Sequence, residues 1–340
     1  MPKQGEKVTI KSIAEELGVS FSTVAKALND DPRISEQTKA MVKKKAQEMN
    51  YVRNYFAQNL RHQESYTVAI ILSDIDIPVY SEMITRLSSD LSRYGYTTIV
   101  SAPHYGEEAE RNCIQSVLSR MPKAVIISPA NPASKNVRLL APIFKNTLIL
   151  GKPHEEVKAN YLSLDHRKAG YLNAKHLLEN GRCKNLILCG LKEYESSLLF
   201  YQGVEEAYTE FGLTVDETLV SWFRPGEQVA CQRVTEVWQQ NPGSIDGVIC
   251  FCDTLAFGVY RAARTLGLSV PEDISVVGYD DNPNNDFTAP PLTSIRQPKD
   301  QLTKYCMEFA LKCLKNEETE LQTWQLEPVL SQRKSVCPKK

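Results

Sequence analysis

A group of polar side chains near the start of the sequence has the chemistry to bind a polyanion. It combines ammonium, hydroxyl and amide groups between positions 9 and 29: Thr9, Lys11, Ser20, Ser22, Thr23, Lys26 and Asn29. An ammonium group can donate to guanine O6 and N7 in the DNA major groove. Hydroxyl and amide groups commonly donate to phosphate oxygens. Such a set can act together only if short, rigid elements present it on one surface.

The spacing of apolar residues predicts these elements. Positions i, i+3, i+4 and i+7 of the first segment form one face of a helix: Ile10, Ile13, Ala14 and Leu17. Thr9 precedes this helix as an N-cap, and Gly18 can end it in the left-handed conformation. Ser20 then caps a second helix, and Ser35 caps a third. Three short helices around one small core predict a helix-turn-helix head.

The distribution of charge separates this head from the rest of the chain. Residues 1–62 hold 11 Lys and Arg against 7 Asp and Glu, whereas the remainder holds 29 against 34. A nearly neutral chain therefore divides into a basic head and an acidic body, and the basic head favours a polyanionic partner. For the run Lys43 to Lys45 alone, a solvated helix face is the alternative interpretation.

From Tyr66 onward, short apolar runs alternate with helical stretches. The apolar runs are 67–72, 96–100, 124–127, 148–150, 185–188, 247–250 and 274–277, with helices predicted at about 79–94 and 107–120. Continuous apolar strands separated by helices are typical of parallel sheets that are covered on both faces. Because a single open sheet of so many parallel strands would be unusual, we expect two sheets, with the division near Asp165.

Several motifs at fixed spacing resemble the lactose-repressor/galactose-repressor family of bacterial transcriptional regulators. They lie at 8–14, 18–20, 23–24, 28–29, 50–52 and 57–60, at 270–280 (VPEDISVVGYD), and at 291–298 and 331–335. The resemblance covers essentially the whole chain. It implies a helix-turn-helix head at 1–53, a hinge helix and linker at 54–65, and a two-lobed, periplasmic-binding-protein-like α/β core at 66–340. It places lobe 1 at about 66–163 plus 294–322, and lobe 2 at about 164–293 plus 323–340.

The resemblance also implies which residues of the head contact DNA. Base readout falls to Lys11, Ser22 and Lys26. Phosphate binding falls to Thr9, Ser20, Thr23 and Asn29. For Lys26, a contact to phosphate alone is the alternative, because an ammonium group suits both partners.

In the family, a short hinge helix forms on DNA and inserts a leucine into the minor groove. The matching residues of this chain are Asn54, Ala57, Leu60 and Arg61, with Leu60 as the wedge. An apolar wedge costs unstacking, which is offset by the contacts that the bent DNA permits. Arg53 stands where the family commonly has proline, so we expect a looser linker with an added cation.

A small-molecule site is implied at the strand ends between the two lobes. The residues at the matching positions are Val79, Tyr80, Asp165, Tyr194, Phe200, Phe223, Asp253 and Asp280. Phe200 stands where sugar-binding members usually have an arginine, so the site has fewer cationic donors. We therefore expect a neutral or partly apolar ligand, altered contacts to a sugar, or no small-molecule effector at all.

Other classes of function find no support in the sequence. There is no apolar leader, and no apolar run approaches the ~18 residues that span a membrane, so we expect a cytoplasmic protein. The nine cysteines are scattered apart from Cys250 and Cys252, and the five histidines form no ligand pair. We therefore expect no metal and no cofactor. No phosphate loop, nucleophile elbow or dinucleotide fingerprint supports an enzyme.

These inferences favour a transcriptional regulator, with repression expected over activation, that binds a palindromic operator as a homodimer. A small molecule between the lobes would shift its affinity for DNA, as inducer or as corepressor. One alternative is a solute-binding receptor-like protein without a regulatory role, which the DNA-binding head opposes. Another is a DNA-binding regulator that has lost its effector.

Overall fold

The structure, a computed structural model, describes residues 8–51, 65–73, 75, 78–104, 106–129, 134–153, 156–192, 194–317 and 320–339. The chain divides into two compact units, Met1–Glu64 and Ser65–Lys340. The predicted hinge residues lie outside the described residues, together with Arg53: Asn54, Ala57, Leu60 and Arg61. None of the helices in the described ranges is long and apolar enough to cross a membrane.

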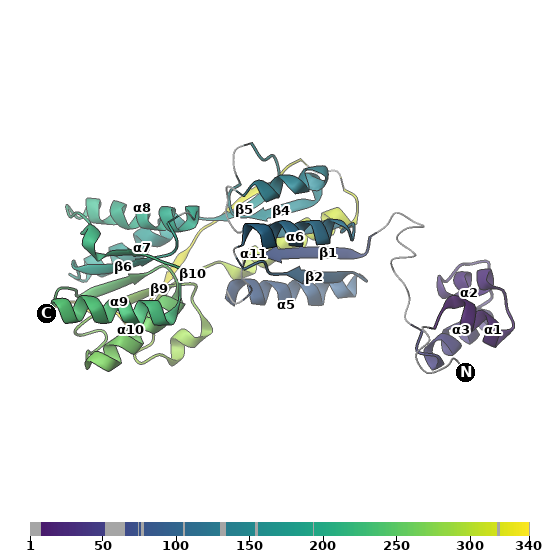
Figure 1. Cartoon of the computed structure of the whole chain (residues 1–340), viewed down its shortest axis with the longest axis horizontal. Helices are drawn as coiled ribbons and strands as arrows, with labels where there is room; N and C mark the ends of the chain where they lie inside the picture. Colours follow the sequence, from purple (N-terminus) through teal and green to yellow (C-terminus); the bar gives the residue numbers. More distant parts are fainter. Residues whose placement is uncertain are drawn as a thin grey trace. The chain divides into compact units, whose positions relative to one another are not determined.

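Within residues 8–51 the N-terminal unit consists of three short helices, as the apolar spacing predicts: α1 (Ile10–Leu17), α2 (Phe21–Leu28) and α3 (Glu36–Glu48) (Figure 1). Each helix begins after a hydroxyl residue whose side chain accepts from a backbone N–H of the first turn: Thr9, Ser20 and Ser35. Gly18 ends α1 with a φ of 63°, which glycine adopts without a steric penalty. The apolar faces meet in one small core, made by Ile13, Ala14, Val24, Ala27, Val42 and Ala46.

Among the described residues, the larger unit forms two six-stranded sheets, which confirms the predicted α/β core with parallel sheets. The first sheet has the order β11 (Thr323–Leu326), β5 (Asn160–Leu164), β4 (Thr147–Leu150), β3 (Ala124–Ser128), β1 (Thr67–Leu72) and β2 (Thr97–Ser101). All of its neighbouring strands are parallel. The central strands are buried along nearly their whole length because helices cover both faces.

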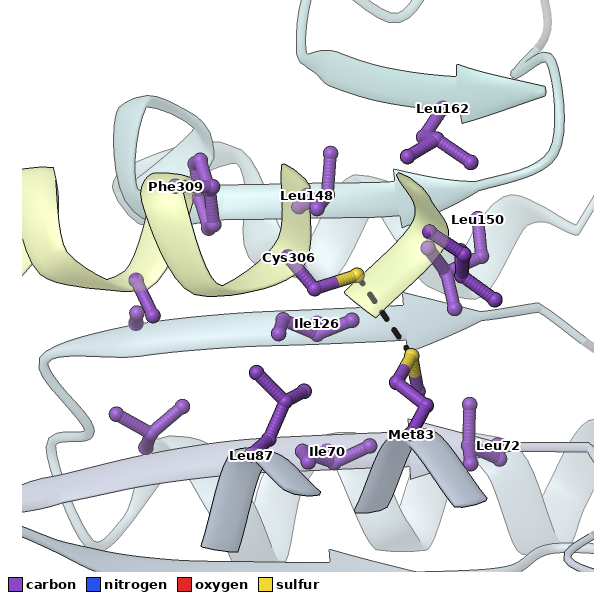
Figure 2. Packing of buried hydrophobic residues seen from close by; sticks show 14 of the residues in the cluster. Ile70, Leu72, Met83, Leu87, Ile126, Leu148, Leu150, Leu162, Cys306 and Phe309 are labelled. Atoms are coloured by element: carbon purple, nitrogen blue, oxygen red, sulfur yellow. Dashed lines mark hydrogen bonds between the residues drawn. The ribbon is translucent and has the colours of Figure 1, made fainter. Parts of the chain in front are cut away.

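Two layers of helices enclose the first sheet and complete the first lobe (Figure 1). Helices α5 (Pro78–Arg93) and α11 (Lys299–Leu314) pack on one face, and α6 (Glu107–Leu118) packs on the other with the 3-10 segment η1 (Lys135–Asn146). Figure 2 shows the first layer, in which Met83 and Leu87 meet Cys306 over the strands. The Cys306 Sγ donates to Met83 Sδ at 3.6 Å, and burial raises the pKa of the Cys306 thiol to about 12. Cys306 is therefore a protonated core thiol.

The second sheet has the order β12 (Val329–Ser331), β10 (Thr293–Arg296), β9 (Ser275–Tyr279), β8 (Gly247–Cys250), β6 (Asn185–Cys189) and β7 (Val220–Trp222). Among these strands, β12 alone runs antiparallel to its neighbour. Helices α9 (Glu227–Gln240) and α10 (Asp253–Leu266) cover one face, and α7 (His166–Glu179) and α8 (Glu195–Glu210) cover the other. Helices α7 and α8 approach closely at Gly203, where a Cβ would lie 1.8 Å from the Arg167 carbonyl oxygen.

Within the described ranges the chain crosses between the lobes three times, after β5, β10 and β11. The lobe boundaries differ from the predicted ones at the last two crossings. Strand β10 pairs with β9 in the second sheet, although residues from 294 were expected in lobe 1. Strand β11 pairs with β5 in the first sheet, although 323–340 were expected in lobe 2. Backbone pairing between distant strands decides these memberships, and a local motif carries no information about it.

Candidate functional site

The polar residues of the head occupy cap positions that fix the three helices. The Thr9 Oγ1 accepts from the Ser12 N–H at 3.2 Å, and the Ser12 Oγ accepts from the Thr9 N–H at 3.1 Å. The Ser20 Oγ accepts from the Thr23 N–H at 3.0 Å and lies 2.8 Å from the Thr23 Oγ1. A hydroxyl has one donor and two acceptor sites, so these caps are compatible with a further contact to phosphate.

The predicted reading residues lie on the outer surface of the head. Val24 and Ala27 of α2 are fully buried, whereas Ser22 of the same helix is exposed and Lys26 is partly exposed. Lys11 is exposed on α1, and Asn29 is exposed where α2 ends. The structure therefore places these donors at the surface, in the arrangement that the spacing predicts.

Two acidic residues follow α2, and cations compensate both of them. The Asp31 carboxylate accepts from the Arg33 Nε at 3.0 Å and Nη2 at 2.7 Å. The Lys43 Nζ lies 2.5 Å from the Asp30 Oδ1. The Arg33 hydrogen bonds, with a smaller effect from the Lys26 charge, hold the pKa of Asp31 well below its usual range. Pairing these carboxylates weakens the repulsion that a phosphate backbone would meet beside the end of α2.

A second group of polar side chains comes from strand ends and crossings of both lobes, and we name it the inter-lobe cluster: Tyr80, Ser128, His166, Tyr279, Asp280 and Gln297. In the first lobe, the Tyr80 Oη lies 3.2 Å from the Ser128 Oγ. In the second, the Tyr279 Oη lies 3.0 Å from the His166 Nδ1. Burial raises the pKa of Tyr80, and the charge of Asp280 in the second lobe raises it further.

Asp280 contributes the carboxyl group of the inter-lobe cluster. It follows β9 with a φ of 118°, a strained conformation for a residue other than glycine. Its Oδ1 accepts from the Gln297 Nε2 at 2.6 Å. Burial raises the pKa of Asp280 well above its usual range, and the nearby charge of Asp253 adds to this effect. The carboxyl group is thus held partly buried at a strand end, in the place predicted for a ligand contact.

The structure corrects the prediction that Asp253 contacts an effector. Asp253 is 1% exposed, and its oxygens are occupied within the second lobe. The Oδ2 accepts from the Asn282 N–H at 2.7 Å and the Asn285 Nδ2 at 2.8 Å, and the Oδ1 accepts from the Ser294 Oγ at 2.6 Å. These bonds tie α10 to β10 and to the segment containing η3 (Pro283–Phe287), so the role of Asp253 is structural.

Two other predicted effector residues also lie inside the cores. Val79 is 2% exposed and packs in the core of the first lobe. Phe200 is 0% exposed and packs in the second lobe, with its ring edge-on to Phe251 at 5.4 Å and 6.1 Å from the Tyr279 ring. Both predictions are corrected because an apolar side chain at these helix positions is more stable in the core than at a polar lobe surface. Phe200 supports the Tyr279 ring from beneath.

The remaining predicted effector residues lie at or near the ends of second-lobe elements. Asp165 caps α7 by accepting from the Lys168 N–H at 2.8 Å, and its Oδ2 accepts from the Gln325 Nε2 at 3.2 Å. Tyr194 is partly buried at the start of α8. Phe223 is partly buried just after β7 and packs against the second-lobe core. These side chains are positioned by the helix starts and strand ends that the fold supplies.

Four members of the inter-lobe cluster were not predicted from the sequence: Ser128, His166, Tyr279 and Gln297. Ser128 and Tyr279 are the last residues of β3 and β9. The rule that ligands bind at the carboxyl ends of parallel strands would have selected both of them. His166 and Gln297 lie just after β5 and β10, at two of the lobe crossings.

Among the residues that the structure describes, no group of three or more His, Cys, Asp or Glu side chains could hold a metal ion. Residues 9–54 match the family model for bacterial regulatory proteins of the lacI family, and residues 174–336 match the model for a periplasmic binding protein-like domain. The chain belongs to the lacI family. The predicted family is therefore confirmed in both parts of this lacI-family chain.

Curated relatives match almost the whole lacI-family chain. The HTH-type transcriptional repressor PurR of Vibrio vulnificus (strain CMCP6) is 28% identical over 337 residues, covering 96% of this chain and 98% of that protein. The HTH-type transcriptional regulator GalR of Escherichia coli (strain K12) is 24% identical over 328 residues, covering 96% and 95%. These relatives are transcriptional regulators and not enzymes, in agreement with the expectation from the sequence.

Solved structures with the same fold extend over both units. A lac repressor dimer bound to operator and the anti-inducer ONPF superposes with a TM-score of 0.82 at 23% identity, covering 98% of this chain and 100% of that one. The complex of the transcriptional regulator CelR with cellobiose gives a TM-score of 0.72 at 24% identity, covering 97% and 100%. At these identities the likeness establishes the fold of this lacI-family chain.

Proposed function

We propose that this chain is a sequence-specific repressor of transcription that binds a palindromic operator as a homodimer. The observation that carries the proposal is the surface of α2, where Ser22 and Lys26 lie outside while Val24 and Ala27 are fully buried. Helices of this kind present their outer side chains to base edges in the major groove. Access to chromosomal DNA requires that the protein act in the cytoplasm.

One exposed aromatic residue supports the homodimer. Phe287 ends η3 in the second lobe and is 86% exposed, which is unusual for so large an apolar side chain. Its removal from water in a symmetric interface would be favourable. A two-fold dimer would present two heads to two half-sites, and this accounts for a palindromic operator.

We further propose that a small molecule binds at the inter-lobe cluster and shifts the affinity for DNA. The cluster combines a partly buried carboxyl, Asp280, with the hydroxyls of Tyr80 and Ser128, so it suits a neutral ligand that carries hydroxyl groups. Phe200 brings no positive charge to this place, because its side chain is an uncharged ring that is buried next to Tyr279. A ligand that prefers one lobe arrangement would change DNA affinity by about 1–3 kcal/mol of coupling.

Selection from random DNA with the full-length, ligand-free protein tests the main proposal. The expected result is enrichment of one palindrome with half-sites about one helical turn apart. The selection is repeated with neutral sugars and nucleobases, because a corepressor would make binding conditional on ligand. Failure to enrich any sequence under all of these conditions, or enrichment of a single asymmetric site, contradicts a dimeric operator reader.

The proposed hinge wedge has its own test in Leu60→Ala. Loss of the inserted side chain should weaken binding to the selected operator far more than binding to random DNA, since only the specific complex bends the duplex. Fluorescence anisotropy with both DNAs at one salt concentration measures the two affinities. Equal losses on both DNAs would remove the wedge role from Leu60.

A further inference from the structure

The second lobe carries a pocket of about 460 Å³ at the amino ends of its strands. Its wall carries two charged groups on which the argument rests, Asp216 and Arg233, together with several polar side chains. The strands β6 and β8 begin beside the pocket, whereas Asp280 lies at the carboxyl end of β9. Because β6, β8 and β9 are parallel, the pocket lies at the amino ends of the strands and the inter-lobe cluster lies at their carboxyl ends. Pockets of this size hold small metabolites.

Arg233 supplies a fixed positive charge to the pocket. Its Nε donates to the Ser221 Oγ at 2.9 Å, and its Nη2 donates to the Thr218 carbonyl oxygen at 2.9 Å. These two bonds hold the plane of the guanidinium group. In the part of the chain that the structure describes, no carboxylate forms an ion pair with Arg233, so its charge is available to a bound carboxylate.

Asp216 supplies a fixed negative charge to the same pocket. Its Oδ1 accepts from the Thr218 N–H at 3.0 Å and from the Thr218 Oγ1 at 2.7 Å. Both hydrogen bonds lower the pKa of Asp216, so the carboxylate is ionised at neutral pH. Among the described residues, neither Arg233 nor any other cation forms an ion pair with it.

Thr218 determines the arrangement of these two charges. Its carbonyl accepts from Arg233, while its N–H and hydroxyl donate to Asp216. One residue therefore anchors a guanidinium and a carboxylate that do not pair with each other. A ligand that carries both an anionic and a cationic group would satisfy both charges at once, whereas a simple anion would be repelled by Asp216.

The rest of the wall indicates the character of such a ligand. Gln240, Asn241 and Asn185 contribute carboxamide groups, and the buried Ser244 Oγ has no hydrogen-bond partner within the described ranges. Helix α9 ends at Gln240, beside the pocket. The negative end of the helix dipole therefore favours an ammonium group there. The exposed Lys184 adds a second cation for a carboxylate.

We propose that this pocket binds a free α-amino acid with a polar side chain. The ligand carboxylate pairs with Arg233, the α-ammonium group pairs with Asp216, and the carboxamides of the wall bind the side chain. This site goes beyond the proposed operator and effector functions, because it lies at the amino ends of the second-lobe strands and the inter-lobe cluster lies at their carboxyl ends. It gives the second lobe a ligand that is chemically distinct from the neutral one expected at the inter-lobe cluster.

Isothermal titration calorimetry of the full-length protein with L-glutamine and two truncated analogues tests the proposal. L-Glutaminamide lacks the carboxylate, and 4-carbamoylbutanoate lacks the ammonium group. Each loss of one charge-assisted pair should weaken binding about tenfold. Equal affinity for all three compounds would overturn the zwitterion proposal. So would the absence of binding by L-glutamine, L-asparagine and L-serine up to their solubility limits.

Matched variants assign each charge to its partner. Arg233→Gln should abolish the discrimination between L-glutamine and L-glutaminamide, and Asp216→Asn should abolish the discrimination between L-glutamine and 4-carbamoylbutanoate. Asn keeps a side-chain acceptor for Thr218, so the second variant is expected to fold. Arg264→Gln, on the exposed end of α10 outside the pocket, controls for the change in net charge. If Arg264→Gln weakens binding as much as Arg233→Gln, the pocket is not the binding site.

Discussion

In the head, the capping hydrogen bonds join residues three positions apart, whereas the hydrogen bonds of Asp253 and Tyr279 in the second lobe join residues 29 to 113 positions apart. The hydroxyls of the head stay at the surface, where they are free to meet a phosphate. The carboxyl of Asp253 and the phenol of Tyr279 are buried and already bonded inside the lobe. In the head, local hydrogen bonds hold polar groups at the surface. In the second lobe, long-range hydrogen bonds hold polar groups inside the core and fix the elements around the inter-lobe cluster.

This difference has an energetic consequence. A surface cap can be lost at the cost of one hydrogen bond, because water replaces the missing partner. A buried polar group has no water to replace its partner, so several groups lose their bonds together. Mutations of polar residues in the two regions should therefore differ in the size and the range of their effects.

The largest effect is expected for Asp253→Ala. Removing the carboxylate leaves the donors of Asn282, Asn285 and Ser294 without acceptors, so the free energy of unfolding should fall by about 3–5 kcal/mol. Urea denaturation measures this change. The control is Asp300→Ala, whose side chain is 87% exposed and pairs with Arg86 at the surface, so about 0–1 kcal/mol is expected. Similar costs for the two variants would remove the contrast between buried and exposed polar groups.

The next effect concerns DNA readout by the head. Lys26→Ala should lower the discrimination between bases by about 1–3 kcal/mol at one or two operator positions. Repeating the DNA selection with the variant measures this loss. Lys44→Ala, at an exposed position of α3, serves as the control and should leave the selected motif unchanged. A motif that also survives Lys26→Ala would make Lys26 a phosphate contact.

The third effect is the pH dependence of the stability that the second lobe owes to His166. Burial lowers the pKa of His166 to about 4, so the folded protein holds it neutral while the unfolded chain takes up a proton near pH 6.5. The His166 contribution to stability is therefore intact above pH 6.5 and is lost as the pH falls toward 4, by about 2–3 kcal/mol.

Denaturation of the wild type and of His166→Gln at several pH values isolates this contribution. Asp253 and Asp280 have raised pKa values and change stability in the opposite direction on acidification, but they are common to both proteins. The stability of the wild type relative to His166→Gln should fall by about 2–3 kcal/mol as the pH decreases from 6.5 to 4. A constant difference over this range would contradict a buried neutral imidazole.

The smallest effect is expected for a single cap in the head. Ser20→Ala removes the acceptor for the Thr23 N–H and should destabilise α2 by about 1 kcal/mol. Amide hydrogen exchange of residues 21–28 in the full chain detects this local change. Ser22→Ala on the same helix removes no cap and should change protection by less than about 0.5 kcal/mol. A larger effect for Ser22 would show that the caps do not control this helix.

The same contrast explains what could be predicted from the sequence. The helices of the head follow from apolar spacing and from Thr9, Gly18 and Ser20, which act on their own neighbours. The two sheets also follow, because apolar strands alternate with helices. The burial of Phe200 and the occupied oxygens of Asp253 depend on elements that are distant in sequence, and no local pattern reports them.

The short outer strands illustrate the same limit. Strands β5, β7 and β11 have partly exposed residues and lack a continuous apolar run, so they were not predicted as strands. The family motif at 331–335 overlaps the last described strand, β12 (Val329–Ser331), only at Ser331. The edge strands β7, β11 and β12 each pair with a single neighbour, and their position is set by this pairing rather than by hydrophobicity.

The three crossings between the lobes also bear on the order in which the protein can fold during synthesis. The edge strands β11 and β12 complete the first and second sheets, and both follow residue 320 in the chain. Neither sheet can therefore be completed on the ribosome until nearly all of the chain described here has been translated. The head needs only residues up to about 51, so it can fold while both lobes are still incomplete. A nascent chain would thus acquire its DNA-binding surface well before it acquires the unit proposed to regulate it.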